Sequence, residues 1–169
     1  MAESQVFDPY AILAALDRQR VTYIVVGSFA RVVRGAEEVP DDLDIVPSLR
    51  AENVRRLNEA LRDLEAVDAA GKKVAVEAST ITNEPLIEAT TAAGDLKIVP
   101  EPEGTRGYDD LRRAATMEHL GRGLRPSVAS TGDLARMLAA LGREHDLPKL
   151  QALRHVAELE RRLGPELTL

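Results

Sequence analysis

The 169-residue sequence predicts an α/β (α+β) fold in which a short mixed sheet is flanked by helices and followed by a C-terminal helical segment. Two observations predict it. Short β-branched runs alternate with segments whose apolar residues recur at helical spacing. The composition, with 44% hydrophobic and 30% charged residues, is that of an ordinary globular protein. We expect residues 1–120 to form the core and residues 121–169 to form a helical segment packed on it.

The first elements alternate between helix and strand. Asp8-Pro9 predicts a helix start, because Asp can cap a helix and Pro suits its first turn. The β-branched run 21–26 predicts a buried strand that ends at Gly27. A short helix should follow over residues 28–34.

The next strand is predicted over residues 43–46, where Pro47 ends it. Ser48 can cap the following helix. The helix is indicated by one apolar stripe made of Val54, Leu57, Leu61 and Leu64.

Further strands are predicted over residues 74–76, 86–91 and 95–99, and a helix over residues 108–120. A loop rich in Pro and Gly separates the last of these strands from that helix.

The C-terminal segment is predicted to be mainly helical. Residues 128–129 could form a short strand, and Ser130 with Asp133 resembles a capping box for the next helix. The last helix should begin near Asp146 and end before Gly164. Its inward-facing residues are expected to be Leu150, Leu153, Val156 and Leu163.

Charge and composition exclude several classes of protein. The net charge of −6 argues against a nucleic-acid binder with a broad basic surface. Because there is no Cys, disulfides, thiolate zinc sites and cysteine nucleophiles are excluded. No apolar run approaches the roughly 20 residues that span a bilayer, and the N-terminus lacks the features of a signal peptide. We therefore expect a cytoplasmic protein without membrane contact.

The first candidate site is Gly27-Ser28, between the end of a strand and the start of a helix. Glycine lets a ligand approach the backbone closely, and free N–H groups with a Ser hydroxyl can bind phosphate. The alternative is an ordinary strand-to-helix turn in which Ser28 is the cap.

The second candidate is the pair Asp42 and Asp44. Residues two apart in a strand point to the same side, so both carboxylates should face one point while Leu43 enters the core. Such a pair can hold Mg²⁺. The alternative is a solvated acidic turn, because Glu37, Glu38 and Asp41 are close in sequence.

The order of strand, Gly27-Ser28, short helix and Asp42-x-Asp44 strand resembles the signature of the DNA polymerase β-like nucleotidyltransferase superfamily. The resemblance implies a nucleotidyltransferase-type fold. It implies that Gly27 and Ser28 bind a nucleoside triphosphate, and that Asp42 and Asp44 hold catalytic Mg²⁺ or Mn²⁺. It also implies a third acid on a later strand.

The chain is further similar to the AbiEii-like toxin branch of that superfamily. The similarity extends over residues 94–107 and 128–153. Within the second range the matching residues are Ser130, Asp133, Leu134, Gly142, Arg143 and Asp146. It makes Arg143 and Asp146 candidate nucleotide-binding residues, although Asp146 could equally cap the last helix.

Two positions depart from this branch. The third acid is replaced by Lys97, and Asp95 on the same strand face is the carboxylate that could substitute for it. A Lys expected to touch the triphosphate is replaced by Leu138. Lys97 could enter the site and supply the missing cation, which would bind phosphate but weaken metal binding.

The resemblance implies Mg²⁺-dependent transfer of a nucleoside monophosphate from a nucleoside triphosphate to an RNA acceptor, such as tRNA, or to a protein acceptor. The alternative is a catalytically impaired binding or regulatory protein of the same fold, such as one half of a toxin–antitoxin pair with a cognate protein partner. A third alternative is a structural interaction module without a ligand.

Overall fold

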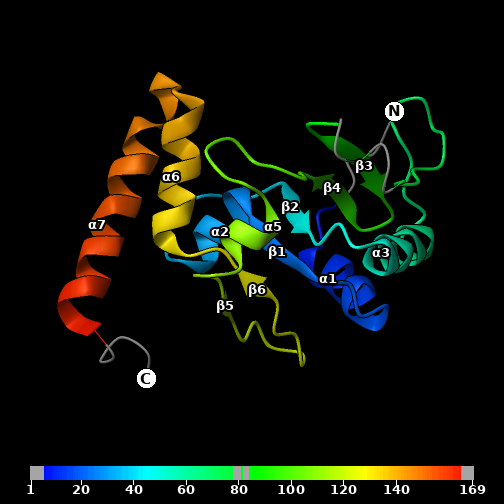
Figure 1. Ribbon diagram of the computed structural model, residues 1–169, viewed down its shortest axis with the longest axis horizontal. Coiled ribbons are helices and arrows are strands. Elements are labelled where there is room, and N and C mark those ends of the chain that lie inside the picture. Colours follow the sequence, from blue (N-terminus) through cyan, green and yellow to red (C-terminus); the bar gives the residue numbers. More distant parts are fainter. Residues whose placement is uncertain (1–5, 78–80, 82–83, 165–169) are drawn as a thin grey trace.

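A mixed sheet forms the centre of the protein (Figure 1). The computed structural model describes residues 6–77, 81 and 84–164. Within them the sheet has six strands in the order β3-β4-β2-β1-β6-β5. The strands are β1 (Tyr23–Val26), β2 (Asp42–Pro47), β3 (Ile87–Thr91), β4 (Gly94–Ile98), β5 (Thr116–Met117) and β6 (Ser127–Val128). The predicted α/β fold class is therefore confirmed.

Helices lie at both ends of this sheet and also beside its centre (Figure 1). They are α1 (Pro9–Arg18), α2 (Gly27–Val33), α3 (Ala51–Asp63), α5 (Tyr108–Leu111), α6 (Thr131–Leu141) and α7 (Leu147–Leu163), with a 3₁₀ turn, η1 (Glu144–Asp146), before α7. Helices α1 and α3 pack together, while α6 lies between α2 and the outermost helix, α7. No described helix has the length and apolar content needed to cross a bilayer.

The register of the central strands positions the candidate site. Strands β1 and β2 are antiparallel, so the last residue of β1, Val26, lies opposite Asp44. Strands β2 and β4 are parallel, with Asp42 opposite Asp95 and Asp44 opposite Lys97. The end of β1 and the beginnings of β2 and β4 therefore meet at one edge of the sheet.

The core consists of aliphatic side chains, as the low aromatic content requires. Alternate residues of the central strands are fully buried beneath α1 and α3. The strand residues are Ile24, Leu43, Ile45, Leu96 and Ile98, and the core also contains Ile12 and Leu16 of α1 and Leu57 of α3.

Two helix caps agree with the sequence and one does not. Asp8 and Ser130 accept hydrogen bonds from the backbone N–H groups of Ala11 and Asp133. Ser48 does not cap α3, which begins after Arg50 without a side-chain cap. The amide of Asn53 instead binds the Ser48 carbonyl and both backbone groups of Thr22.

Two predicted elements differ from those in the structure. Residues 74–76 form no strand, because the side-chain amide of Asn58 binds both backbone groups of Val76. The helix predicted over residues 108–120 ends at Leu111. Beyond it, the Arg34 guanidinium binds Thr116, Glu118 and the backbone carbonyls of β6 and Ala129, which holds β5 in the sheet.

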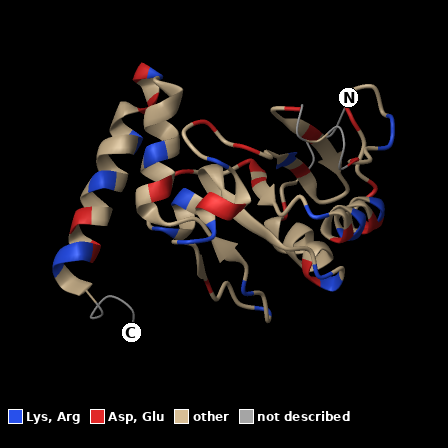
Figure 2. Cartoon of the chain, viewed as in Figure 1, with Lys and Arg blue, Asp and Glu red and all other residues tan. Residues whose placement is uncertain are grey.

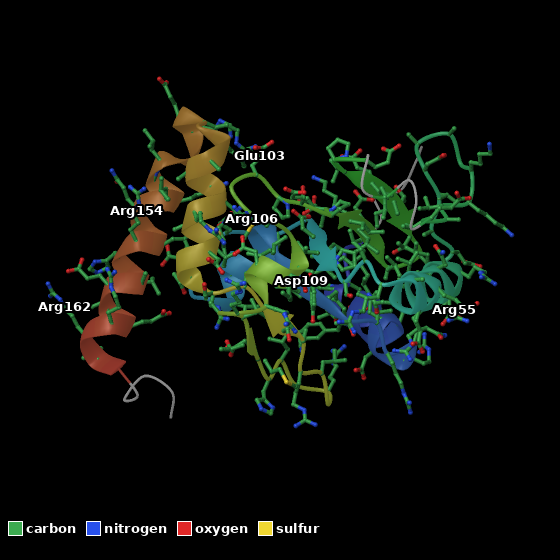
Figure 3. All side chains as sticks on the ribbon, in the orientation of Figure 1. Arg55, Glu103, Arg106, Asp109, Arg154 and Arg162 are labelled. Carbon is green, nitrogen blue, oxygen red and sulfur yellow. The ribbon has the colours of Figure 1, made fainter. Side chains whose placement is uncertain are left out.

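Helix α7 packs against α6 through Leu150 and Leu153. Leu163 was expected to face inward, but it is 45% exposed because its end of the helix extends beyond α6. Basic and acidic residues follow one another along α7 (Figure 2). Arg154 and Arg162 project away from the protein (Figure 3), as expected for a solvated face.

Candidate functional site

Gly27 lies directly against the carboxylate of Asp44. A Cβ atom at position 27 would stand 2.4 Å from Oδ2 of Asp44, well inside van der Waals contact. The backbone φ of Gly27 is +73°, a conformation that side chains disfavour. Position 27 therefore requires glycine for two separate reasons, and the first follows from the end of β1 opposite Asp44.

Asp42 and Asp44 share one face of β2, while Leu43 between them is fully buried. Oδ1 of Asp44 is buried and has no hydrogen-bond partner among the described residues. Burial, and then the negative charge of Asp42, raise the pKa of Asp44 to about 7, while Lys97 and Arg31 oppose the rise. The pair is thus a strained, partly buried anionic site and not a solvated turn.

Lys97 points into this pair of carboxylates. Its Nζ lies 2.9 Å from Oδ2 of Asp42, and the hydrogen bond to Asp42 raises the pKa of Lys97. Asp44 and Glu88 add further negative charge around the ammonium group. Lys97 thus enters the site, as considered from the sequence, and its ion pair with Asp42 balances part of the negative charge of the two aspartates.

Asp95 lies beside Asp42 in the parallel register, but its side chain is exposed. Among the described residues there is no group of three or more His, Asp or Glu side chains able to hold a metal ion. The site therefore offers two carboxylates and an ammonium group, with Asp95 at its margin.

The carboxylate pair fits one hard divalent cation. Mg²⁺ and Mn²⁺ prefer carboxylate oxygens, and Oδ1 of Asp44 is a buried oxygen without a hydrogen-bond partner in the described part of the chain. A cation there would remove the cost of burying that charged oxygen. Lys97 competes for the other aspartate, because its ammonium group, bound to Oδ2 of Asp42, repels a second cation at the same carboxylate.

Ser28 follows Gly27 in the first turn of α2 and is partly buried. Its hydroxyl takes no hydrogen bond among the described residues. Val26, and not Ser28, is the N-cap residue. The simple capping role considered from the sequence therefore does not describe Ser28.

A second charged cluster, which sequence reasoning missed, lies beside α2. The guanidinium of Arg31 binds Glu38 through two hydrogen bonds of 2.7 and 2.9 Å, and both side chains are nearly buried. Nζ of Lys149, from α7, lies 3.5 Å from the same carboxylate. The sequence offers one sign that Arg31 lies near the candidate site. It stands four residues after Gly27, and residues four apart lie on the same face of a helix.

Arg143 and Asp146 form part of the same cluster. Asp146 is 2% exposed, and its Oδ2 accepts a hydrogen bond from Nε of Arg143 at 2.5 Å. Lys149 and His145 lie 4.0 and 3.6 Å from Oδ1 of this carboxylate. Asp146 stands at the start of α7, but its side chain makes no capping hydrogen bond.

Leu138 lies in the core, at 3% exposure, on the buried side of α6. It borders a cavity of about 150 Å³ between α6 and α7. Two surface hollows of about 570 and 600 Å³ are lined by Arg106 and its neighbours and do not include Asp42 or Asp44. The buried carboxylate oxygen without a hydrogen-bond partner among the described residues belongs to Asp44, outside both hollows. The carboxylate pair is therefore the better candidate for the functional site.

The fold of this chain is similar to those of solved protein structures. The chain resembles the crystal structure of a protein from Thermotoga maritima that is designated a presumed nucleotidyltransferase. The TM-score is 0.56 at 17% sequence identity, and the alignment covers 89% of this chain and 96% of that chain. No protein-family model and no curated protein matches the sequence. The likeness shows a nucleotidyltransferase-type fold.

Proposed function

We propose that this protein is a nucleotidyltransferase of the DNA polymerase β-like superfamily, related to the AbiEii-like toxin branch. In this proposal it transfers a nucleoside monophosphate from a nucleoside triphosphate to a tRNA or other RNA acceptor, or to a protein acceptor. One observation carries the proposal. Gly27, which has no room for a side chain, lies against Asp44 at the point where β1 ends and β2 begins.

Each residue has a role in this proposal. The backbone of Gly27 and the hydroxyl of Ser28 bind the triphosphate. Asp42 and Asp44 would hold Mg²⁺ or Mn²⁺, which when bound neutralises charge on the phosphoryl group. The acceptor hydroxyl forms a bond to the α-phosphorus, the bond to the β-phosphate breaks, and pyrophosphate leaves. Asp95, exposed beside Asp42, is the carboxylate available to take the hydroxyl proton.

A second candidate function is supported by the Lys97–Asp42 ion pair. An ammonium group that occupies Oδ2 of Asp42 lowers the affinity for a metal ion. The protein would then bind nucleotides with little turnover and act as a regulatory protein, such as one half of a toxin–antitoxin pair in the cytoplasm. The cognate toxin or antitoxin would be its protein partner.

Incubation with each radiolabelled nucleoside triphosphate, Mg²⁺ and either bulk tRNA or bulk protein separates these functions. Transfer of label supports the enzyme, while Mg²⁺-dependent binding without transfer supports the regulatory protein. The double variant Asp42→Asn, Asp44→Asn should abolish Mg²⁺-dependent nucleotide binding without unfolding the domain. The matched control is Asp109→Asn, which alters a carboxylate that is 91% exposed. Nucleotide affinity that is unchanged in the double variant would refute both functions at this site.

A further inference from the structure

We propose that Lys149, carried by α7, is a polyphosphate-binding residue of the nucleotide site. The inference rests on the proposed function, because it assigns an additional residue to the same nucleotide. It concerns Lys149 and the charged cluster formed by Arg31, Glu38, Arg143 and Asp146.

The cluster adjoins the carboxylate pair through Arg31. This residue lies one helical turn after Gly27, and helical side chains lean back toward the preceding turn. The positive charge of Arg31 acts on Asp44, where it lowers the pKa of the carboxyl, so the cluster lies close to the carboxylate pair. Glu38 joins this guanidinium to Lys149, because its Oε1 is 2.9 Å from NH2 of Arg31 and 3.5 Å from Nζ of Lys149.

Lys149 is held more loosely than the arginines of the cluster. Its two ion pairs, to Glu38 at 3.5 Å and Asp146 at 4.0 Å, are longer than charge-assisted hydrogen bonds. Its side chain is 41% exposed, whereas that of Arg31 is 12% exposed. A half-exposed ammonium on a flexible four-carbon stem can turn toward an incoming anion at small cost.

The charge balance of the cluster also favours an anion. Three permanent cations, Arg31, Arg143 and Lys149, surround two carboxylates, Glu38 and Asp146. Each carboxylate already has a close arginine partner, so the charge of Lys149 is the least compensated. Leu138 is buried in the core, so α6 supplies no cation at that position. Lys149 would give the phosphate chain a cation from α7 instead.

The ligand chemistry follows from this geometry. A cation located beyond Arg31, away from the carboxylate pair, would meet the outer phosphates of a nucleoside triphosphate. A nucleoside monophosphate has no group that extends so far. Lys149 should therefore distinguish triphosphates from monophosphates and should contribute little to recognition of the base.

The test is equilibrium binding of the four ribonucleoside triphosphates and their monophosphates, with Mg²⁺, to the wild type, Lys149→Met and Lys149→Arg. Loss of one charged hydrogen bond should weaken triphosphate binding about tenfold in Lys149→Met. Monophosphate affinity should stay unchanged, and Lys149→Arg should restore most of the triphosphate affinity. Lys72→Met is the matched control, because Lys72 is exposed and its side chain takes no ion pair among the described residues.

Thermal unfolding of the same variants shows whether the substitution destabilises the protein by loss of the ion pairs that Lys149 forms with Glu38 and Asp146. An unchanged unfolding temperature means that a loss of affinity reflects lost ligand contact. Equal losses of triphosphate and monophosphate affinity in Lys149→Met, or no loss of either, would overturn the inference and leave the proposed function intact. A wild type that binds none of the four triphosphates would instead remove the proposed function itself.

Discussion

At the scale of single residues, charge density governs the candidate site. Asp44 combines a buried, unpartnered oxygen with a neighbouring carboxylate and a glycine backbone in contact. Such an arrangement is costly in the absence of a ligand, because a buried anion without compensation loses its hydration. Lys97 compensates part of this cost by its ion pair with Asp42. The stability of the protein should therefore respond to changes at both positions.

The raised pKa of Asp44 predicts a specific pH dependence. Between the usual carboxyl range and a pKa of about 7, the folded protein retains a proton that the unfolded chain has released. The free energy of unfolding therefore falls as pH rises through this window. Asp44→Asn removes the ionisable group and with it this pH dependence. The free energy of unfolding of the variant should therefore exceed that of the wild type by on the order of 2 kcal/mol above pH 8, and by little near pH 4. Urea denaturation across this pH range measures the difference.

Asp109→Asn is the control for this experiment, because Asp109 is an almost fully exposed carboxylate. A difference between Asp44→Asn and the wild type that does not change with pH would contradict the prediction.

Replacement of Lys97 should alter metal binding directly. Lys97→Met keeps the length of the side chain but frees Oδ2 of Asp42 for a divalent cation. We expect Mn²⁺ to bind the variant roughly tenfold more tightly than the wild type, a difference of about 1.4 kcal/mol. Electron paramagnetic resonance of free Mn²⁺ measures this without nucleotide, with Lys72→Met as the control. Equal Mn²⁺ affinity in Lys97→Met and the wild type would show that the ion pair does not limit metal binding.

A Lys97→Asp, Leu138→Lys double change, which the departures from the AbiEii-like branch suggest, is unsuited to the same purpose. Leu138 is 3% exposed, so Leu138→Lys would bury an ammonium group in the core.

At the scale of secondary structure elements, single polar side chains set where strands and helices end. Arg34 binds residues of both β5 and β6. Asn58 binds the backbone groups of Val76, where a strand was predicted. Asn53 binds Thr22 just before β1 and Ser48 just after β2. Each satisfies several backbone groups that would otherwise be buried without a partner. Of the three, Asn53 bears on the candidate site, because it joins Thr22, which precedes β1, to Ser48, which follows β2.

Asn53 provides the clearest test at this scale. Its buried amide makes three hydrogen bonds, to the N–H and carbonyl of Thr22 and to the carbonyl of Ser48. Asn53→Ala leaves these groups without their partner and should lower the free energy of unfolding by about 2–4 kcal/mol. Urea denaturation measures the loss. Glu52→Ala, which truncates an exposed neighbour, should change stability by less than about 0.5 kcal/mol. Similar losses in the two variants would mean that the hydrogen bonds of Asn53 contribute nothing.

At the scale of the whole molecule, the topology of the sheet assembles the site from segments that are distant in sequence. Strand β4 pairs in parallel with β2, which places Lys97 beside Asp44 despite 52 intervening residues. Helix α7 returns along α6, and Lys149 thereby reaches Glu38 in the connection between α2 and β2. The proposed triphosphate site would thus draw on both ends of the chain.

The sequence by itself determined the fold class, the positions of β1, β2, β4, α6 and α7, and the facing of Asp42 and Asp44. These features follow from local physics: β-branched runs, helical periodicity, capping residues and the two-residue repeat of a strand. The contact of Gly27 with Asp44, the burial of Glu38 and Asp146 and the ion pairs of Lys149 were decided only by the tertiary structure. Such contacts depend on which strands pair and on how far α7 folds back, and no local pattern encodes either. For the same reason Leu163 could not be placed from its periodicity, because a helix face is buried only where another element covers it.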